Sequence, residues 1–137
     1  MTIILRILPD EFTLYQWSRE YKLSYDLLNL PWYTISKTAS ELSLLVPSDS
    51  AAPELLLATK KEPGWRCLQV DAQMDFSLVG ILAAIVDPLR DHQIPVFVVS
   101  TFDTDYVLVK KETLEKAIGV LDAVANITLK PGQSVLD

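Results

Sequence analysis

The sequence holds one cysteine, Cys67, and one histidine, His92, among 137 residues. A single cysteine excludes an internal disulfide, and the apolar run around Cys67 predicts a small buried side chain. Two such residues cannot form a Cys/His cluster with metal-binding spacing. A phosphate-binding glycine loop and the glycine-flanked serine of hydrolases are also missing. We therefore expect no cofactor, no metal site and no enzymatic activity.

Long hydrophobic runs and basic stripes are missing as well. No window reaches the ~18 uninterrupted apolar residues that a membrane helix needs, and the N-terminus lacks the basic start of a signal peptide. The net charge is −6, whereas phosphate binding needs a basic surface. We expect a cytoplasmic protein that contacts neither membranes nor nucleic acid. Half of the residues are hydrophobic, which is enough for a folded core.

Helical periodicity is clear in the second half of the chain. One apolar stripe follows Ser77, at spacings of three and four residues, and predicts a helix with Ser77 or Asp75 as its cap. We expect Pro88 to kink or end this helix, because proline removes a backbone hydrogen bond. A second stripe predicts a helix from Leu114 to Ala125. The two stripes consist of Leu78, Ile81, Leu82, Ile85, Val86 and Leu89, and of Leu114, Ala117, Ile118, Leu121, Val124 and Ala125.

Runs of β-branched and aromatic residues predict strands around these helices. In the second half the strands are Trp65–Val70, Ile94–Thr101, Tyr106–Lys110 and Ile127–Leu129, and Ile94–Thr101 has the composition of a strand covered on both faces. In the first half we expect a short segment Ile3–Ile7 ended by Pro9, a strand Glu11–Trp17, a hairpin of Trp32–Lys37 with Glu41–Val46, two helical turns over Glu54–Lys61 and a turn at Pro63-Gly64. Residues 18–30 give no consistent period.

The element order from Trp65 onward is β-α-β-β-α-β. With two helices on one face of a four-stranded sheet, this is the ferredoxin-like α+β fold. Residues 1–64 have a looser order that fits a degenerate copy of the same unit. We therefore divide the chain into an N-terminal unit, residues 1–64, and a complete C-terminal unit, residues 65–137.

Two stretches carry side chains that suit a small zwitterionic ligand. The start of the helix after Asp75 offers amides without intrahelical partners, which can hold a carboxylate. Gly80 has no Cβ and allows close approach of a ligand or of a packed neighbour. Asp75, Asp103 and Asp105 could hold an ammonium group. Each aspartate also has a structural explanation, as a helix cap or as a residue of the hairpin turn Phe102–Asp105.

These two stretches connect different pairs of elements. We expect the first β-α connection and the loop between the second and third strands to lie at opposite ends of adjacent strands. They need not share one pocket within a single unit, and a combined site forms more easily across two packed copies.

The runs Asp75-Phe-Ser-Leu-Val-Gly-Ile-Leu-Ala83 and Ser100-Thr-Phe-Asp-Thr-Asp-Tyr-Val-Leu-Val109 resemble the ACT-domain family. Similar proteins are tandem ACT proteins related to the regulatory part of aspartate kinases, and the Castor-type arginine sensors of animals. The resemblance implies a ferredoxin-like fold, amino-acid binding between ACT units and no catalysis. It places the ligand against Asp75, Phe76, Ser77, Leu78, Val79 and Gly80, and against a second motif with Thr101, Asp103, Thr104 and Asp105.

The animal sensors have four ACT units, and this chain has at most two. A comparable interface then requires a homodimer. The sequence thus predicts a regulatory, non-catalytic module that binds an amino acid as a dimer. The alternative is a module with the same fold that dimerises or docks onto a protein partner without a small-molecule ligand.

Overall fold

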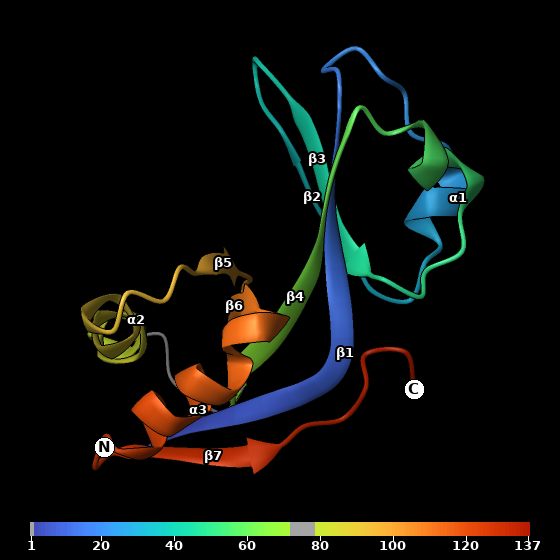
Figure 1. Cartoon of the computed structure of the whole chain (residues 1–137). Coiled ribbons are helices and arrows are strands. Elements are labelled where there is room, and N and C mark those ends of the chain that lie inside the picture. The colour runs from blue at the N-terminus through green and yellow to red at the C-terminus, as the bar shows by residue number, and fades with distance from the viewer. Residues whose placement is uncertain (1, 72–78) are drawn as a thin grey trace. The chain divides into compact units, whose positions relative to one another are not determined.

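A computed structural model describes residues 2–71 and 79–137, which form two compact units. Unit 1 comprises Met1–Pro9 and Trp65–Ser134, and unit 2 comprises Asp10–Gly64 and Val135–Asp137. The predicted division after residue 64 remains a prediction; unit 1 groups Met1–Pro9 with Trp65–Ser134, and unit 2 groups Val135–Asp137 with Asp10–Gly64. Strands β1 (Ile3–Trp17) and β4 (Lys60–Val70), labelled in Figure 1, each contribute residues to both units.

Both long strands pass through residues that we expected to interrupt them. The break at Pro9 is wrong because Pro9 falls between two ladders of β1, which pairs through Ile3–Ile7 on one side of it and through Phe12–Trp17 on the other. Because Pro9 lies outside both of these ladders, its lack of a backbone N–H costs neither of them a hydrogen bond. The turn at Pro63-Gly64 is wrong too, because β4 continues through Gly64, whose φ of 84° is a conformation that suits glycine.

Unit 1 contains a largely antiparallel sheet with strand order β7-β1-β4-β6-β5 (Figure 1). Its further elements are α2 (Ile81–Asp91), β5 (Phe97–Ser100), β6 (Asp105–Lys110), the 3-10 turn η2 (Lys111–Thr113), α3 (Leu114–Asp122) and β7 (Ile127–Pro131). From β4 onward this is the predicted β-α-β-β-α-β order. The four-stranded sheet was wrong, because the first residues of β1 lie between β4 and β7. Ile3 pairs in parallel with Ile127 of β7, and Ile4 accepts a hydrogen bond from the Asp71 amide after β4.

The core of unit 1 is aliphatic and lies between one face of this sheet and the two helices. Alternate strand residues point into it, and both predicted helical stripes supply the other side. The fully buried members are Ile3, Leu5, Leu68, Ile85, Leu89, Val107, Val109, Ala117 and Leu121. The short edge strand β5 is only half-buried at Phe97, Val98 and Val99, so the expectation that it is covered on both faces was wrong.

Helix α2 differs from its prediction at both ends. It begins at Ile81, and its N-cap is Gly80 with φ 82° and ψ 9°. The predicted caps Ser77 and Asp75 lie outside the described residues. It also continues through Pro88 to Asp91. Proline costs one hydrogen bond in the last turn, but the fully buried side chains of Ile85 and Leu89 hold this turn against the core.

Unit 2 has shorter helices and an aromatic core. It contains α1 (Tyr25–Leu28), the hairpin β2 (Thr34–Lys37) and β3 (Leu42–Pro47), and the 3-10 helix η1 (Pro53–Leu57). The predicted hairpin is confirmed, and β3 pairs antiparallel with β1. The two helical turns expected over Glu54–Lys61 are instead η1, which ends at Leu57. In the core Trp17 stacks between Tyr15, at 6.1 Å, and Tyr21, at 5.7 Å.

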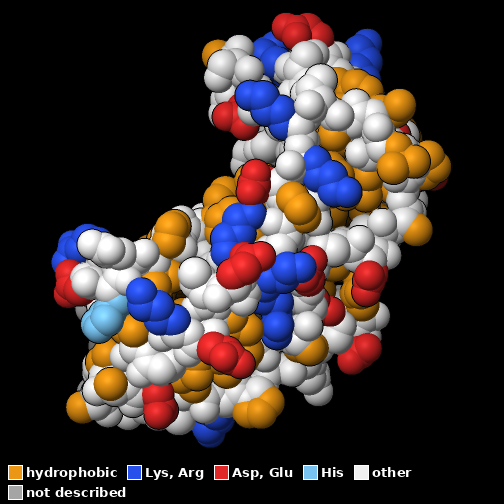
Figure 2. Space-filling model, viewed as in Figure 1, with side chains coloured by type: hydrophobic (Ala, Val, Ile, Leu, Met, Phe, Trp, Pro, Cys, Tyr) orange, Lys and Arg blue, Asp and Glu red, His pale blue; other side chains and the backbone are white. Residues whose placement is uncertain are grey.

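The surface carries charges of both signs. Acidic and basic side chains are interspersed over the face shown in Figure 2, with hydrophobic groups between them. Cys67 is buried, as its apolar neighbours predicted. Among the described residues, no helix is both long enough and apolar enough to cross a membrane.

Candidate functional site

The first predicted binding segment is only partly described by the structure. Asp75, Phe76, Ser77 and Leu78 lie outside the described residues. Val79 and Gly80, which follow them, are exposed at the start of α2, and the Val79 side chain is 91% exposed. The part of the segment that can be examined is therefore an accessible helix start.

Gly80 is explained by its backbone conformation. Its φ of 82° lies in the left-handed region, where a Cβ is unfavourable. Among the described residues, no heavy atom lies within 4 Å of a Cβ built at this position, so packing against a described neighbouring element does not require the glycine. The Ala84 amide bonds the Gly80 carbonyl at 2.9 Å.

The second predicted segment forms a closed turn between β5 and β6. The Thr101 amide donates to the Thr104 carbonyl at 2.8 Å, and the Thr104 amide donates to the Thr101 hydroxyl at 3.2 Å. Just beyond, the Ser100 hydroxyl donates to Asp105 Oδ1 at 2.5 Å. Thr101 and Asp103 are exposed, whereas Thr104 and Asp105 are half-buried. These bonds follow the turn chemistry that the sequence offered as one explanation.

The two predicted segments start from the same end of the unit 1 sheet. The Thr104 hydroxyl donates a hydrogen bond to the carbonyl of Val70, the last residue of β4. The expectation of opposite ends is therefore wrong. A helical crossover returns the chain to begin a strand parallel to the first, so β5 ends where β4 ends. The turn after β5 therefore lies beside the end of β4.

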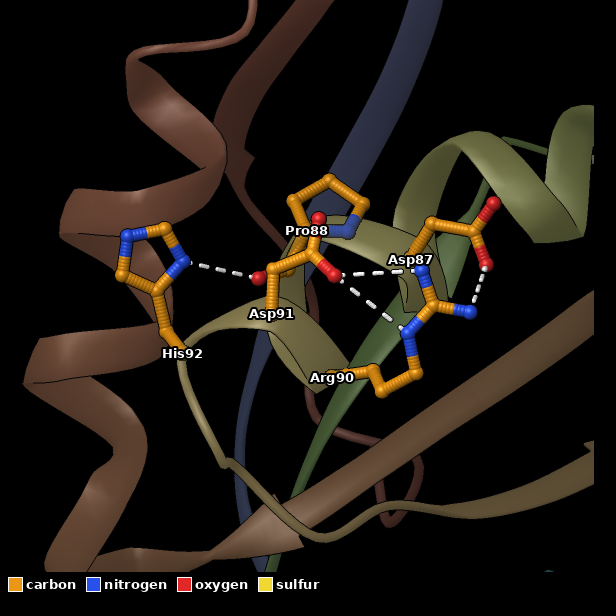
Figure 3. Close-up of polar contacts among 5 residues, drawn as sticks. All are labelled: Asp87, Pro88, Arg90, Asp91 and His92. Atoms are coloured by element: carbon orange, nitrogen blue, oxygen red, sulfur yellow. Dashed lines mark hydrogen bonds and ion pairs between the residues drawn. The ribbon is translucent and has the colours of Figure 1, made fainter.

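The end of α2 carries the only histidine of the chain, and its contacts are structural. His92 is exposed, and its Nδ1 lies 2.9 Å from the Pro88 carbonyl oxygen (Figure 3). Arg90 bonds Asp91 at 3.1 Å and pairs with Asp87 at 3.4 Å. The hydrogen bond to Asp91, together with the charges of Asp91 and Asp87, raises the pKa of Arg90 above its ordinary value. The cluster is a solvated helix end, where basic groups complement the dipole.

In the described part of the chain, no set of three or more His, Cys, Asp or Glu side chains lies close enough together to hold a metal ion. The candidate site is thus an arrangement of backbone amides, hydroxyls and carboxylates. Such groups can bind a charged small molecule through hydrogen bonds.

Sequence reasoning missed a cavity in unit 1. It has a volume of about 420 Å³ and is lined by Arg6, Gln69, Asp71, Pro131, Gly132 and Gln133. The available signal was the alternation of Ile3, Leu5 and Ile7, which leaves Arg6 on the opposite face of a strand.

Residues 60–123 match the family model of the ACT domain. The same part of the molecule contains β4, α2, β5, β6 and α3. The match confirms the resemblance drawn from the sequence. The structure accordingly shows an ACT-type α+β fold with a mostly antiparallel sheet and few helices.

Relatives of known name match a larger part of the chain. Over 97 residues it is 25% identical to "Cytosolic arginine sensor for mTORC1 subunit 1" of Rattus norvegicus. This alignment covers 68% of the chain and 29% of the rat protein. The chain therefore spans less than a third of the length of this relative.

Solved structures match nearly the whole chain. Protein Atu0741 from Agobacterium tumefaciens is 27% identical with a TM-score of 0.80, and the match covers 97% of both chains. The regulatory subunit of aspartate kinase from Thermus thermophilus has a TM-score of 0.61 at 10% identity, over 88% of this chain and 96% of that one. At that identity the second match shows the shared fold alone.

Proposed function

We propose that this chain, whose residues 60–123 match the ACT-domain family, is a non-catalytic regulatory module that binds a free amino acid. The mammalian relative is named as a cytosolic arginine sensor, which supports an amino-acid ligand and a cytoplasmic location. We propose further that residues 1–64 and 65–137 are tandem ACT-like units, of which the first is degenerate.

One observation carries the proposal for the site. The Thr104–Val70 hydrogen bond joins the turn of Thr101, Asp103, Thr104 and Asp105 to the end of β4. The connection that leaves β4 contains the predicted residues Asp75, Phe76, Ser77, Leu78, Val79 and Gly80. Both predicted motifs thus start from one end of one sheet, which supports their contribution to a common site.

Calorimetric titration and thermal shift of the full chain against the twenty L-amino acids test the proposal. We expect at least one of them to bind and to raise the melting temperature, because a ligand that binds only the folded state stabilises it. Asp103→Asn should weaken binding by about tenfold, the usual effect of losing one charged hydrogen bond. Asp122→Asn, an exposed aspartate of α3, is the matched control. Failure of every amino acid at millimolar concentration would refute the proposal.

We propose that the same end of the sheet also forms a dimer interface. Phe102 is 84% exposed in the β5–β6 turn, and Val79 is 91% exposed at the start of α2. Large exposed apolar side chains favour a protein contact. We propose that a second copy of the chain covers them, and that the two copies together form the interface between ACT units that holds the ligand.

Sedimentation equilibrium with and without the amino acid that binds tests this arrangement. We expect a dimer for the wild type and a weaker dimer for Phe102→Ser. Leu56→Ser is the matched control, because Leu56 is 89% exposed on η1 of unit 2. A dimer unaffected by Phe102→Ser would place the interface elsewhere. Dimerisation without response to any amino acid would favour the alternative of a pure interaction module.

A further inference from the structure

The lining of the unit 1 cavity comes from β1 and from its two neighbours in the sheet, β4 and β7. Arg6 belongs to β1, Gln69 and Asp71 lie at the end of β4, and Pro131–Gln133 lie at the end of β7. Two backbone hydrogen bonds tie these walls to β1. The Asp71 amide donates to the Ile4 carbonyl at 3.0 Å, and the Gly132 amide donates to the Ile7 carbonyl at 2.9 Å. The walls are therefore fixed by the sheet itself.

Gly132 brings the backbone unusually close to the stem of Arg6. A Cβ at this position would lie 2.8 Å from Leu8 Cδ2 and 3.2 Å from both Arg6 Cβ and the Ile7 carbonyl oxygen. Any larger residue would push into one of these groups. The base of the Arg6 side chain is thus confined, and its guanidinium extends from a defined position.

Opposite charges meet in this cavity. Arg6 Nη2 lies 3.4 Å from Asp71 Oδ2, and the two side chains remain 38% and 20% exposed. The usual distance of a charge-assisted hydrogen bond is about 2.7–2.9 Å, so the Arg6–Asp71 contact is longer than a typical ion pair with a hydrogen bond. A guanidinium has five N–H donors in a planar fork that suits a carboxylate. Gln69 adds an amide, whose nitrogen donates to the Tyr106 hydroxyl at 3.3 Å.

The pairing of charges selects the class of ligand. A simple anion would be attracted by Arg6 but repelled by Asp71. A simple cation would be attracted by Asp71 but repelled by Arg6. A zwitterion satisfies both groups at once. The volume of about 420 Å³ falls within the ~300–1,000 Å³ typical of small-molecule sites.

We propose that this cavity is a binding site for the charged head of a free α-amino acid. Arg6 binds the α-carboxylate, and Asp71 accepts hydrogen bonds from the α-ammonium. Gln69 orients the head, and Pro131 with Gly132 forms a wall beside it. The site is additional to the segments around Val79 and Thr104, and the choice of an amino acid as ligand rests on the proposed function.

Calorimetric titration of the full chain with each of the twenty L-amino acids, repeated for Arg6→Gln and Asp71→Asn, tests the site. We expect each variant to weaken at least one binding event by about tenfold or more, since each removes a charged hydrogen bond. Arg90→Gln is the matched control, because Arg90 forms an ion pair of the same 3.4 Å length with Asp87 on α2. Its dissociation constants should stay within about twofold of the wild type.

The outcomes separate the site from the proposed function. Amino-acid binding that is unchanged in Arg6→Gln and Asp71→Asn overturns the site and leaves the function standing. Failure of the wild type to bind any amino acid overturns both. A second measurement needs no variant: removal of either the amino or the carboxyl group from the amino acid that binds should abolish the event. An analogue without its amino group that binds as well as the amino acid overturns the role of Asp71.

Discussion

The cores of unit 1 and unit 2 are built in different ways. Unit 1 packs two helices of 11 and 9 residues on one face of a sheet, and its buried side chains are aliphatic. Unit 2 has one α-helix of four residues and a 3-10 helix of five, and its core includes Tyr15 and Trp17. Helices this short do not persist alone in water. Unit 2 must therefore be held by contacts between segments that are distant in the sequence.

A polar contact in unit 2 shows how such segments are joined. Glu54 of η1 accepts hydrogen bonds from the Tyr21 hydroxyl at 3.1 Å, from the Ser24 amide at 3.2 Å and from the Ser24 hydroxyl. Ser24 is the N-cap of α1 and makes no side-chain bond to the helix itself. The start of α1 thus depends on a residue thirty positions away, whereas α2 and α3 of unit 1 depend on their own apolar stripes.

The strongest test of this difference removes part of the aliphatic core. Leu89→Ala should lower the free energy of unfolding by about 2–5 kcal/mol, because Leu89 is fully buried between α2 and the sheet. Urea unfolding followed by far-ultraviolet circular dichroism measures the loss. Leu56→Ala in unit 2 removes an exposed leucine and should change stability by no more than about 0.5 kcal/mol. Equal effects of the two substitutions would contradict the assignment of the core.

Alanine substitutions at two glycines of unit 1 should change the free energy of unfolding in opposite directions. Gly132→Ala should destabilise by about 1–3 kcal/mol, because its Cβ would overlap Leu8 and press on Arg6. Gly119→Ala should stabilise by about 0.5–1 kcal/mol, because Gly119 lies within α3 and a Cβ there meets nothing within 4 Å. The same unfolding measurement compares them. A stabilising Gly132→Ala would show that the segment after β7 does not pack tightly on β1.

The contrast between the units also explains how far the sequence predicted the fold. Periodicity is a local signal, and it located α2, α3 and the strands of unit 1. It could not place Ile3–Ile7 between β4 and β7, because that pairing joins residues more than a hundred positions apart. In residues 18–30 it found no helix, since α1 is a single turn that depends on Glu54.

The candidate site was predicted less completely than the fold. The motifs around Gly80 and Thr104 remain predictions, made because their residue types suit turns and helix starts. Their position at one end of the sheet was missed, although it follows from the parallel direction of β4 and β5. The cavity at Arg6 and Asp71 was missed because it depends on the insertion of β1, which brings residues 65 positions apart together.

The smallest expected loss of stability among these tests comes from the polar contact of unit 2. Glu54→Gln should cost about 1 kcal/mol at neutral pH, because glutamine keeps one acceptor but loses the charge that strengthens these bonds. The free energy of unfolding in urea measures the cost. Glu112→Gln is the control, since Glu112 is exposed on η2 of unit 1. A cost for Glu112→Gln as large as that for Glu54→Gln would show that general charge, and not the contact, is responsible.

The pKa of Glu54 predicts how the stability difference between wild type and Glu54→Gln changes with pH. Hydrogen bonds, first from the Ser24 hydroxyl and then from its amide and Tyr21, lower the pKa of Glu54 below its ordinary value of 4.5. A carboxylate with a depressed pKa in the folded state contributes stability above its unfolded pKa, and the contribution is lost as pH falls through the folded pKa. The difference between wild type and Glu54→Gln should therefore be full at neutral pH and should shrink at pH values below 4.5. A difference that stays constant between neutral and acidic pH would mean that the charge of Glu54 does not hold α1 to η1.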